Sequence, residues 1–230
     1  KIGAPVTAIY NFTAAPARDL NVVGTAGTDV LFGGVGNDTL NGLGSGDVLN
    51  GGDGIDTAIY SGNRSSYTVK ISPVFTVSSL LEGADVLYGV ERLSFADGKM
   101  AYDINGNAGA AALIIGTVVG KAALKNKELV GNVIEMLDSG STVIGISENI
   151  VNSGVIDSLA GGSDNVSFVK LLMRNVLGSD GDATVVNSLS SALDLGFATK
   201  SSMLATASQL DATKLQIDLV GLSASGIEYV

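Results

Sequence analysis

The sequence predicts an α+β protein in which short parallel strands with a β-strand cap are followed by an all-helical domain. Three patterns predict this. A nine-residue period rich in Gly and Asp fills residues 24–59, strand-forming residues follow to about 104, and a 3.6-residue apolar period begins near residue 108. We therefore expect an N-terminal segment (1–23), a coil of strands (24–59), a cap (60–104) and a helical domain (105–230).

The nine-residue repeat consists of four units that follow one another without a gap from Gly24 to Ile59. Glycine opens each unit, and the four are Gly24, Gly33, Gly42 and Gly51. Aspartate occupies the sixth place, as Asp29, Asp38, Asp47 and Asp56, and an aliphatic residue the eighth, as Leu31, Leu40, Leu49 and Ala58. Glycines allow a sharp turn and a close backbone approach, while the eighth-place side chain points inward from a short strand.

The spacing of the aspartates indicates a site for a hard cation. If two units make one coil, Asp29 lies beside Asp47 and Asp38 beside Asp56, and backbone carbonyls from both turns complete two oxygen cages suited to Ca²⁺. The alternative is a flexible Gly/Asp-rich linker, which has no need of a fixed phase across four units. The other candidate ligands are the four first-place glycines, Thr28 and Asn37.

The charges of the repeat also favour Ca²⁺. Residues 24–59 contain five aspartates and no Lys or Arg, so stacked carboxylates would repel one another without a bound divalent ion. The inward side chains are too few to order the coil unaided. The third unit departs from the pattern because Ser45 stands at its fourth place, and we expect a less regular turn there.

These residues resemble the RTX family of calcium-binding proteins exported by type I secretion. The resemblance implies a parallel β-roll at residues 24–59 that binds Ca²⁺ outside the cell. It continues through 60–69 and 89–98, which look like the strand cap that follows such rolls. Independently, 67–71 and 75–77 have strand composition, and Asp97-Gly98 is a hairpin-turn signal.

The second half carries helical patterns, and we expect about seven helices between 108 and 230. One apolar face consists of Leu129, Val130, Val133, Ile134 and Leu137, a second of Phe168, Val169, Leu172, Met173 and Val176, and a third of Val185, Leu189, Ala192 and Leu193. We interpret these faces as core, with a ligand groove as the alternative. Asp164, Asp180 and Asp211 stand near expected helix starts. The phrase 137–140 reappears at 193–196, a faint duplication.

Residues 165–178 and 219–222 resemble the helical domain of unknown function found on many RTX proteins, itself similar to phycobilisome linker helical domains. Two acidic phrases, 103–107 and 180–182, begin like calcium-binding helix–loop–helix loops. Neither has the glycine at the sixth place or the glutamate at the twelfth. We interpret them as an interdomain turn and a helix cap, with an accessory Ca²⁺ site as the alternative.

The composition excludes several functions. The chain has no Cys and no His, which excludes thiolate metal sites and every Ser–His or Cys–His catalytic device, so we expect no enzyme. The net charge of −10 argues against a nucleic-acid partner. The longest apolar stretch, 108–119, is too short to span a membrane.

We therefore expect an extracellular calcium-binding structural protein, a surface-layer or filament subunit. It would fold and self-associate on Ca²⁺ after type I secretion from a Gram-negative bacterium. Its partners would be other copies of itself and the type I exporter. The resemblance to the RTX family implies that the exporter recognises a signal at the extreme C-terminus. The alternative is a C-terminal export and folding module of a larger secreted enzyme or adhesin.

Overall fold

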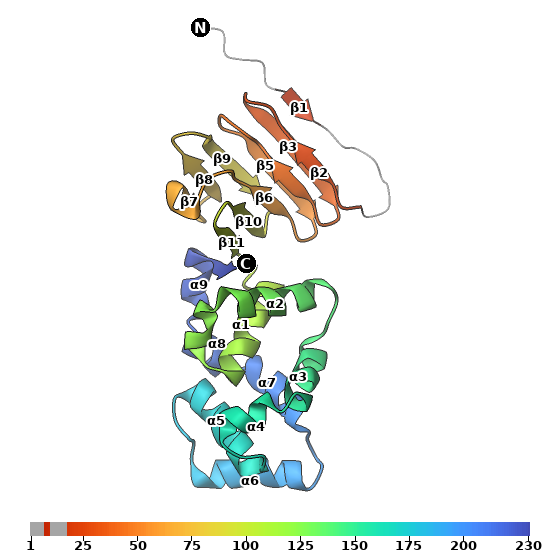
Figure 1. Ribbon diagram of the computed structural model, residues 1–230, viewed down its shortest axis with the longest axis vertical. Helices are drawn as coiled ribbons and strands as arrows, with labels where there is room; N and C mark the ends of the chain where they lie inside the picture. The colour runs from red at the N-terminus through yellow and green to blue at the C-terminus, as the bar shows by residue number, and fades with distance from the viewer. Residues whose placement is uncertain (1–6, 10–17) are drawn as a thin grey trace. The chain divides into compact units, whose positions relative to one another are not determined.

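The computed structural model describes residues 7–9 and 18–230, and the predicted segment 1–23 lies largely outside these residues. The chain forms two compact units, which meet in the sequence between Tyr102 and Asp103. Strands make up the first unit and helices dominate the second (Figure 1). The protein is thus α+β with a helical C-terminal region.

The first unit contains two sheets. Their strands are β1 (Thr7–Ile9), β2 (Asn21–Val23), β3 (Asp29–Val35), β4 (Thr39–Asn41), β5 (Val48–Asp53), β6 (Thr57–Ile59), β7 (Thr68–Lys70), β8 (Thr76–Ser79), β9 (Gly83–Tyr88), β10 (Arg92–Phe95) and β11 (Gly98–Ala101), with a 3₁₀ turn, η1, at Arg64–Ser66. One sheet has the order β1-β3-β5-β9-β8-β7, and the other runs β11-β10-β6-β4-β2 within this unit. Both sheets are mixed, because β7, β8 and β11 pair in antiparallel fashion while the remaining pairs are parallel.

The parallel pairs place the eighth-place residues in two buried rows. In one sheet Leu31 is in register with Leu49 and then Leu87, and in the other Val22, Leu40, Ala58 and Leu93 follow one another. All of them are buried in one apolar cluster between the sheets. Since side chains alternate along a strand, burying this row fixes the register of the whole coil.

Part of the predicted cap continues the parallel coil, and the rest consists of antiparallel hairpins. The hairpin of β7 and β8 and the β10–β11 hairpin at Asp97-Gly98 are antiparallel. However, β9 pairs in parallel with β5, and β10 in parallel with β6. The coil therefore does not end at residue 59, since 83–95 adds one more turn to it. At this end Tyr60, Tyr67 and Phe95 pack together with ring centroids 5.1–5.6 Å apart.

The second unit contains nine α-helices among its described residues, two more than predicted. They are α1 (Asn107–Val118), α2 (Lys127–Asp138), α3 (Val143–Asn152), α4 (Val155–Ala160), α5 (Asn165–Leu177), α6 (Ala183–Asp194), α7 (Lys200–Ser208), α8 (Asp211–Gln216) and α9 (Leu219–Ser225), with η2 at Lys121–Lys125 and β12 at Ile227–Tyr229. Short helices such as α4 and α8, of six residues each, carry too little apolar periodicity to be recognised. None of the helices described is long and apolar enough to cross a membrane.

The predicted apolar faces of α2 and α5 are mostly buried, whereas that of α6 is shifted. Val185 is 45% exposed and its neighbour Val186 takes the buried position. Side chains of α5, α6 and α7 also border an apolar groove, so the faces provide both core and groove.

Helices start at or near all three predicted aspartates, but only Asp164 is itself the capping residue. Asp164 caps α5 through the backbone N–H of Ser167, as expected. Asp182, rather than Asp180, caps α6, and Asp180 instead pairs with the Arg174 Nε at 2.7 Å. Asp211 is the first residue of α8 and follows the N-cap.

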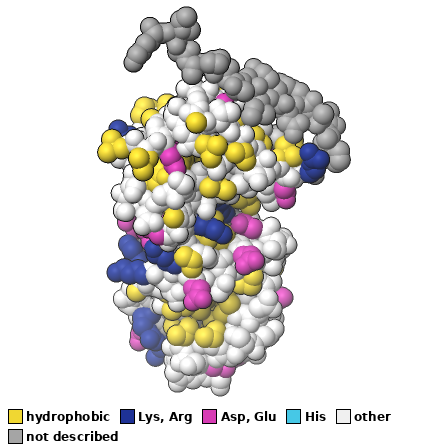
Figure 2. Space-filling view, turned by 45° about the horizontal axis from the view of Figure 1, so that its top comes forward, with side chains coloured by type: hydrophobic (Ala, Val, Ile, Leu, Met, Phe, Trp, Pro, Cys, Tyr) yellow, Lys and Arg dark blue, Asp and Glu magenta, His cyan; other side chains and the backbone are white. Residues whose placement is uncertain are grey.

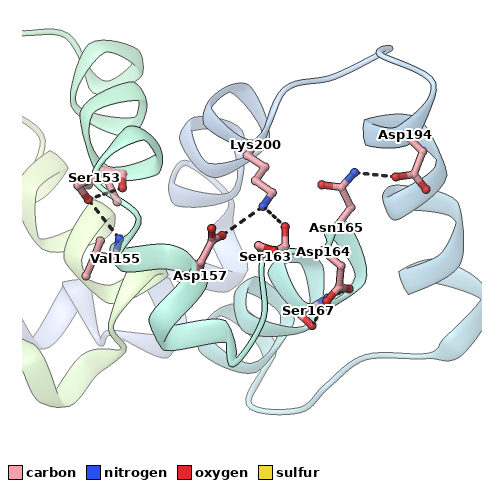
Figure 3. Close-up of polar contacts among 10 residues, drawn as sticks. Ser153, Val155, Asp157, Ser163, Asp164, Asn165, Ser167, Asp194 and Lys200 are labelled. Atoms are coloured by element: carbon pink, nitrogen blue, oxygen red, sulfur yellow. Dashed lines mark hydrogen bonds and ion pairs between the residues drawn. The ribbon is translucent and has the colours of Figure 1, made fainter.

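The faint duplication in the sequence corresponds to a repeated contact. The Asn107 amide at the start of α1 donates to Asp138 at the end of α2 at 2.9 Å. In the same way, Asn165 at the start of α5 donates to Asp194 at the end of α6 at 2.7 Å, as Figure 3 shows. Each Asn–Asp hydrogen bond joins the start of one helix to the end of the next long helix. Near the second bond, the Lys200 ammonium donates to the Ser163 carbonyl at 2.8 Å.

Candidate metal centre

The glycine-rich halves of the repeats form loops that stack on two sides of the coil. Loops 33–38 and 51–56 lie on one side, because Gly34 is in register with Gly52 and Val35 with Asp53. Loops 24–29 and 42–47 lie on the other side, each preceding a strand of the same sheet. The sixth-place aspartates thus stand one above another at intervals of 18 residues.

Three of the four sixth-place aspartates, Asp38, Asp47 and Asp56, use one carboxylate oxygen to accept a backbone N–H of the preceding coil turn. The Asp38 backbone N–H donates to Asp56 Oδ1 (2.7 Å), and the Asp29 N–H donates to Asp47 Oδ1 (2.9 Å). In the same way, Asp38 Oδ1 accepts from the backbone N–H of Leu20 (2.7 Å). The aspartates therefore lie in pairs, joined through a backbone bond rather than facing each other as two free carboxylates.

One oxygen of every sixth-place carboxylate has no hydrogen-bond partner among the described residues. These atoms are Asp29 Oδ1, Asp38 Oδ2, Asp47 Oδ2 and Asp56 Oδ2. The four side chains are at most 2% exposed. Because a buried charged oxygen without a partner costs far more than an ordinary hydrogen bond contributes, a cation bound beside these atoms would stabilise the coil.

Backbone carbonyls surround the unpartnered oxygens. A Cβ at Gly33 would overlap both Asp38 Oδ2 and the Gly51 carbonyl oxygen, so only glycine fits there. A Cβ at Gly52 or Gly54 would likewise overlap the carbonyls of Gly34 and Gly36. The space between loops 33–38 and 51–56 is therefore lined with oxygen atoms, the ligand type that Ca²⁺ prefers.

The electrostatics of the aspartates favour binding of a cation. Burial raises the pKa of Asp56 to about 6, and repulsion from the carboxylates of Glu91 and Asp38 adds to the effect. Burial likewise raises the pKa of Asp47, with a further contribution from Asp29. A divalent cation would relieve both costs.

Most of the oxygen ligands available to Ca²⁺ are backbone carbonyls rather than carboxylates. Among the described residues no three acidic, His or Cys side chains converge where they could hold a metal. Each cage would instead combine a sixth-place carboxylate with carbonyls of two loops, including those of the first-place glycines. Bound there, Ca²⁺ would supply the positive charge that the stacked carboxylates lack.

Two predicted ligands, Asn37 and Thr28, do not lie beside the unpartnered carboxylate oxygens in the way expected. Asn37 Oδ1 accepts the backbone N–H of Ile55 at 2.9 Å, so this side chain braces one loop against the next. Thr28 is exposed, and the neighbour that contacts Asp29 is Thr25, whose backbone N–H and hydroxyl both donate to Asp29 Oδ2 (2.5 and 2.9 Å). Sequence reasoning missed Thr25 because it occupies a glycine place in the pattern.

The backbone of the irregular third unit is strained at two residues. Leu43 and Ser45 have φ values of 70° and 80°, at the places that Gly34, Gly36, Gly52 and Gly54 occupy in loops 33–38 and 51–56. A residue with a Cβ costs about 1–2 kcal/mol in this left-handed region. Both residues adopt a positive φ despite their Cβ atoms, so the expected irregularity appears as backbone strain.

Two acidic residues of the last coil turn, Asp85 and Glu91, were not predicted as part of the site. Asp85 Oδ1 accepts the Asp47 N–H, and Glu91 Oε2 accepts the Asp56 N–H, both at 2.9 Å. They take the place of the sixth-place aspartate although they lie 38 and 35 residues downstream. A signal was present, since Asp-Val-Leu-x-Gly occurs at 29–33, at 47–51 and again at 85–89.

The two accessory acidic phrases serve as turn and cap. Asp103 Oδ2 accepts the backbone N–H of Ala108 at 3.1 Å, which supports the first turn of α1. Asp182 caps α6 through the N–H of Thr184 at 2.8 Å. These contacts favour the structural interpretation of both phrases.

The stacked glycine loops and the 18-residue interval of buried aspartates define calcium-binding nonapeptide repeats. Comparison with protein families agrees, because residues 23–58 match the RTX calcium-binding nonapeptide repeat in four copies. RTX repeats bind Ca²⁺, and they are typical of proteins secreted outside the cell. No curated protein matches the chain.

Proposed function

We propose that the chain is an extracellular calcium-binding structural protein, a surface-layer or filament subunit without enzymatic activity. It folds and self-associates on Ca²⁺ after type I secretion from a Gram-negative bacterium. The observation that carries the proposal is the set of four buried carboxylate oxygens without partners, because it makes folding of the coil conditional on a cation. In the calcium-bound state the two sheets form a parallel β-roll, closed by the strand cap.

Conditional folding suits a chain that is exported before it folds. At the low Ca²⁺ concentration of the cytosol the carboxylates repel one another and the coil stays open. Outside the cell Ca²⁺ binds only the folded coil, so its binding free energy becomes folding free energy. The type I exporter is therefore a partner of the unfolded chain, and it reads a signal at the C-terminal end.

Exposed apolar side chains support association between folded copies. Leu195 and Phe197, in the turn after α6, are 69% and 82% exposed, and Leu215 and Val220 are each 78% exposed. Hydrophobic side chains are visible on the surface in Figure 2. Side chains exposed in this way could be covered by contact with a second copy of the chain. The net charge of −10 opposes association, and bound Ca²⁺ lowers that repulsion.

A calcium titration followed by light scattering and negative-stain microscopy tests the proposal. We expect ordered homo-oligomers at millimolar Ca²⁺ and monomers after chelation. The Asp38→Ala/Asp56→Ala double variant should stay monomeric because its coil does not fold. The control Asp53→Ala, which changes an exposed side chain of the same loop, should assemble like the wild type.

A monodisperse, folded monomer at millimolar Ca²⁺ and high protein concentration would contradict the structural role. That outcome would instead favour a C-terminal export and folding module of a larger secreted enzyme or adhesin, because such a module needs calcium for folding alone.

A further inference from the structure

The last turn of the coil, residues 83–95, lies outside the four matched repeats, yet it repeats their geometry on one side. Each candidate calcium site between the matched repeats has three features: an unpartnered buried carboxylate oxygen, a first-place glycine beside it, and a carbonyl from the next loop. Between loops 33–38 and 51–56 these are Asp38 Oδ2, Gly33 and the Gly51 carbonyl.

The same three features recur between loop 51–56 and the turn at Gly89–Glu91. Asp56 is fully buried and its Oδ2 has no partner among the described residues. A Cβ at Gly51 would overlap both the Asp56 side chain and the Gly89 carbonyl oxygen. The Gly52 carbonyl faces the same turn, 2.9 Å from where a Cβ of Gly89 would stand.

The turn also provides a carboxylate in place of the missing aspartate. Glu91 accepts the Asp56 N–H at 2.9 Å, as Asp56 accepts that of Asp38. The turn from Gly89 to the acidic residue is three residues shorter than in the repeats, and glutamate has one methylene more than aspartate. The longer side chain thus reaches the position that the shorter turn would leave empty.

We propose that Asp56, Glu91 and the carbonyls of Gly52 and Gly89 form a third calcium site, beyond the two predicted from the repeats. The site joins the turn before β10 to the last matched repeat, so that calcium also orders residues downstream of the repeats. This inference rests on calcium binding by RTX repeats and is independent of self-association.

The opposite side of the coil has no equivalent site. The three atoms nearest a Cβ at Gly42 all belong to Asp47, and none is a carbonyl of the next loop. Residue 80, which would be in register with Gly42, is a fully exposed leucine. Asp85 accepts the Asp47 N–H, and its carboxylate also interacts with the Tyr60 side chain. The series of stacked carboxylates on that side, Asp29, Asp47 and Asp85, therefore ends beside Tyr60.

Native mass spectrometry of the full chain in Ca²⁺ tests the proposal by counting bound ions. We expect Glu91→Gln to bind one ion fewer than the wild type, since the amide oxygen still accepts the Asp56 N–H but carries no charge. The matched control Asp85→Asn changes the corresponding acidic residue on the other side of the coil and should bind as many ions as the wild type. An unchanged ion count and affinity in Glu91→Gln would overturn the proposal.

A second measurement needs no variant and covers the case in which Glu91→Gln does not fold. Crystals of the wild-type chain grown with Tb³⁺ report each site by anomalous scattering. A peak between Asp56 and Glu91 is the expected result, whereas peaks only between the matched repeats would refute the third site. Neither readout depends on assembly, so failure of the site and failure of the proposed structural role are distinguishable.

Discussion

Removing the charge of Asp56 should have opposite effects with and without calcium. The metal-free folded coil holds this carboxyl at a pKa of about 6, against an ordinary value of 3.8, chiefly because it is buried. A raised pKa means that the folded state binds the proton more tightly than the unfolded chain. Stability of the metal-free coil therefore falls as the pH rises from about 4 through 6, and the loss is complete at neutral pH.

The size of the effect follows from the shift. About two pKa units correspond to about 3 kcal/mol of destabilisation by the ionised carboxylate at neutral pH. Asp56→Asn is neutral at every pH and keeps an oxygen for the Asp38 N–H, while its amide can donate toward the Gly89 carbonyl. We expect it to stabilise the metal-free coil at pH 7 by up to about 3 kcal/mol. With calcium present the same variant loses a ligand and becomes less stable than the wild type.

Far-UV circular dichroism measures both effects, as the strand signal that persists in metal-free buffer at each pH and as the urea midpoint in calcium buffer. The exposed Asp53→Asn is the control and should leave both conditions unchanged. Equal destabilisation of Asp56→Asn in the two buffers would refute the reasoning, as would a metal-free wild type whose stability is independent of pH between about 4 and 7.

Three other outcomes follow from the same geometry. Chelation at neutral pH should remove the strand signal of 24–59 in circular dichroism and leave most of the helical signal, and identical spectra would contradict this. Asp38→Ala or Asp56→Ala should weaken Ca²⁺ binding in calorimetry more than Asp53→Ala, and equal losses would rule out carboxylate ligation. Leu43→Gly should stabilise the calcium-bound coil by about 1 kcal/mol because it relieves a left-handed residue, whereas Leu43→Ala, which keeps the Cβ, should not.

The sequence was most informative where residue type and spacing are fixed by the same physical need. Aspartate and leucine at constant places in a nine-residue period determine both the strand register and the pairing of Asp38 with Asp56, because the two rows must face opposite environments. The buried faces of α2 and α5 were predictable for a similar reason, since each spans three or more helical turns.

The last turn of the coil could not be predicted from the period alone. Asp85 lies 38 residues after Asp47 because the β7–β8 hairpin is inserted between them, and Glu91 lies 35 residues after Asp56. An insertion breaks the period without breaking the register, because the strands on either side still bury Leu49 against Leu87. Only the recurrence of Asp-Val-Leu-x-Gly indicates the continuation, and a fixed-period search does not find it.

The double use of each carboxylate explains why calcium and strand stacking are inseparable here. In Asp38 and Asp56 one oxygen accepts a backbone N–H of the preceding coil turn, while the other lies beside a glycine carbonyl of the following turn. A cation that fixes the second oxygen also orients the first, so each bound ion strengthens the backbone bond one turn earlier. Order thus passes from turn to turn, as in other stacked repeats, up to the last turn of the coil. This is the turn in which Glu91 replaces aspartate.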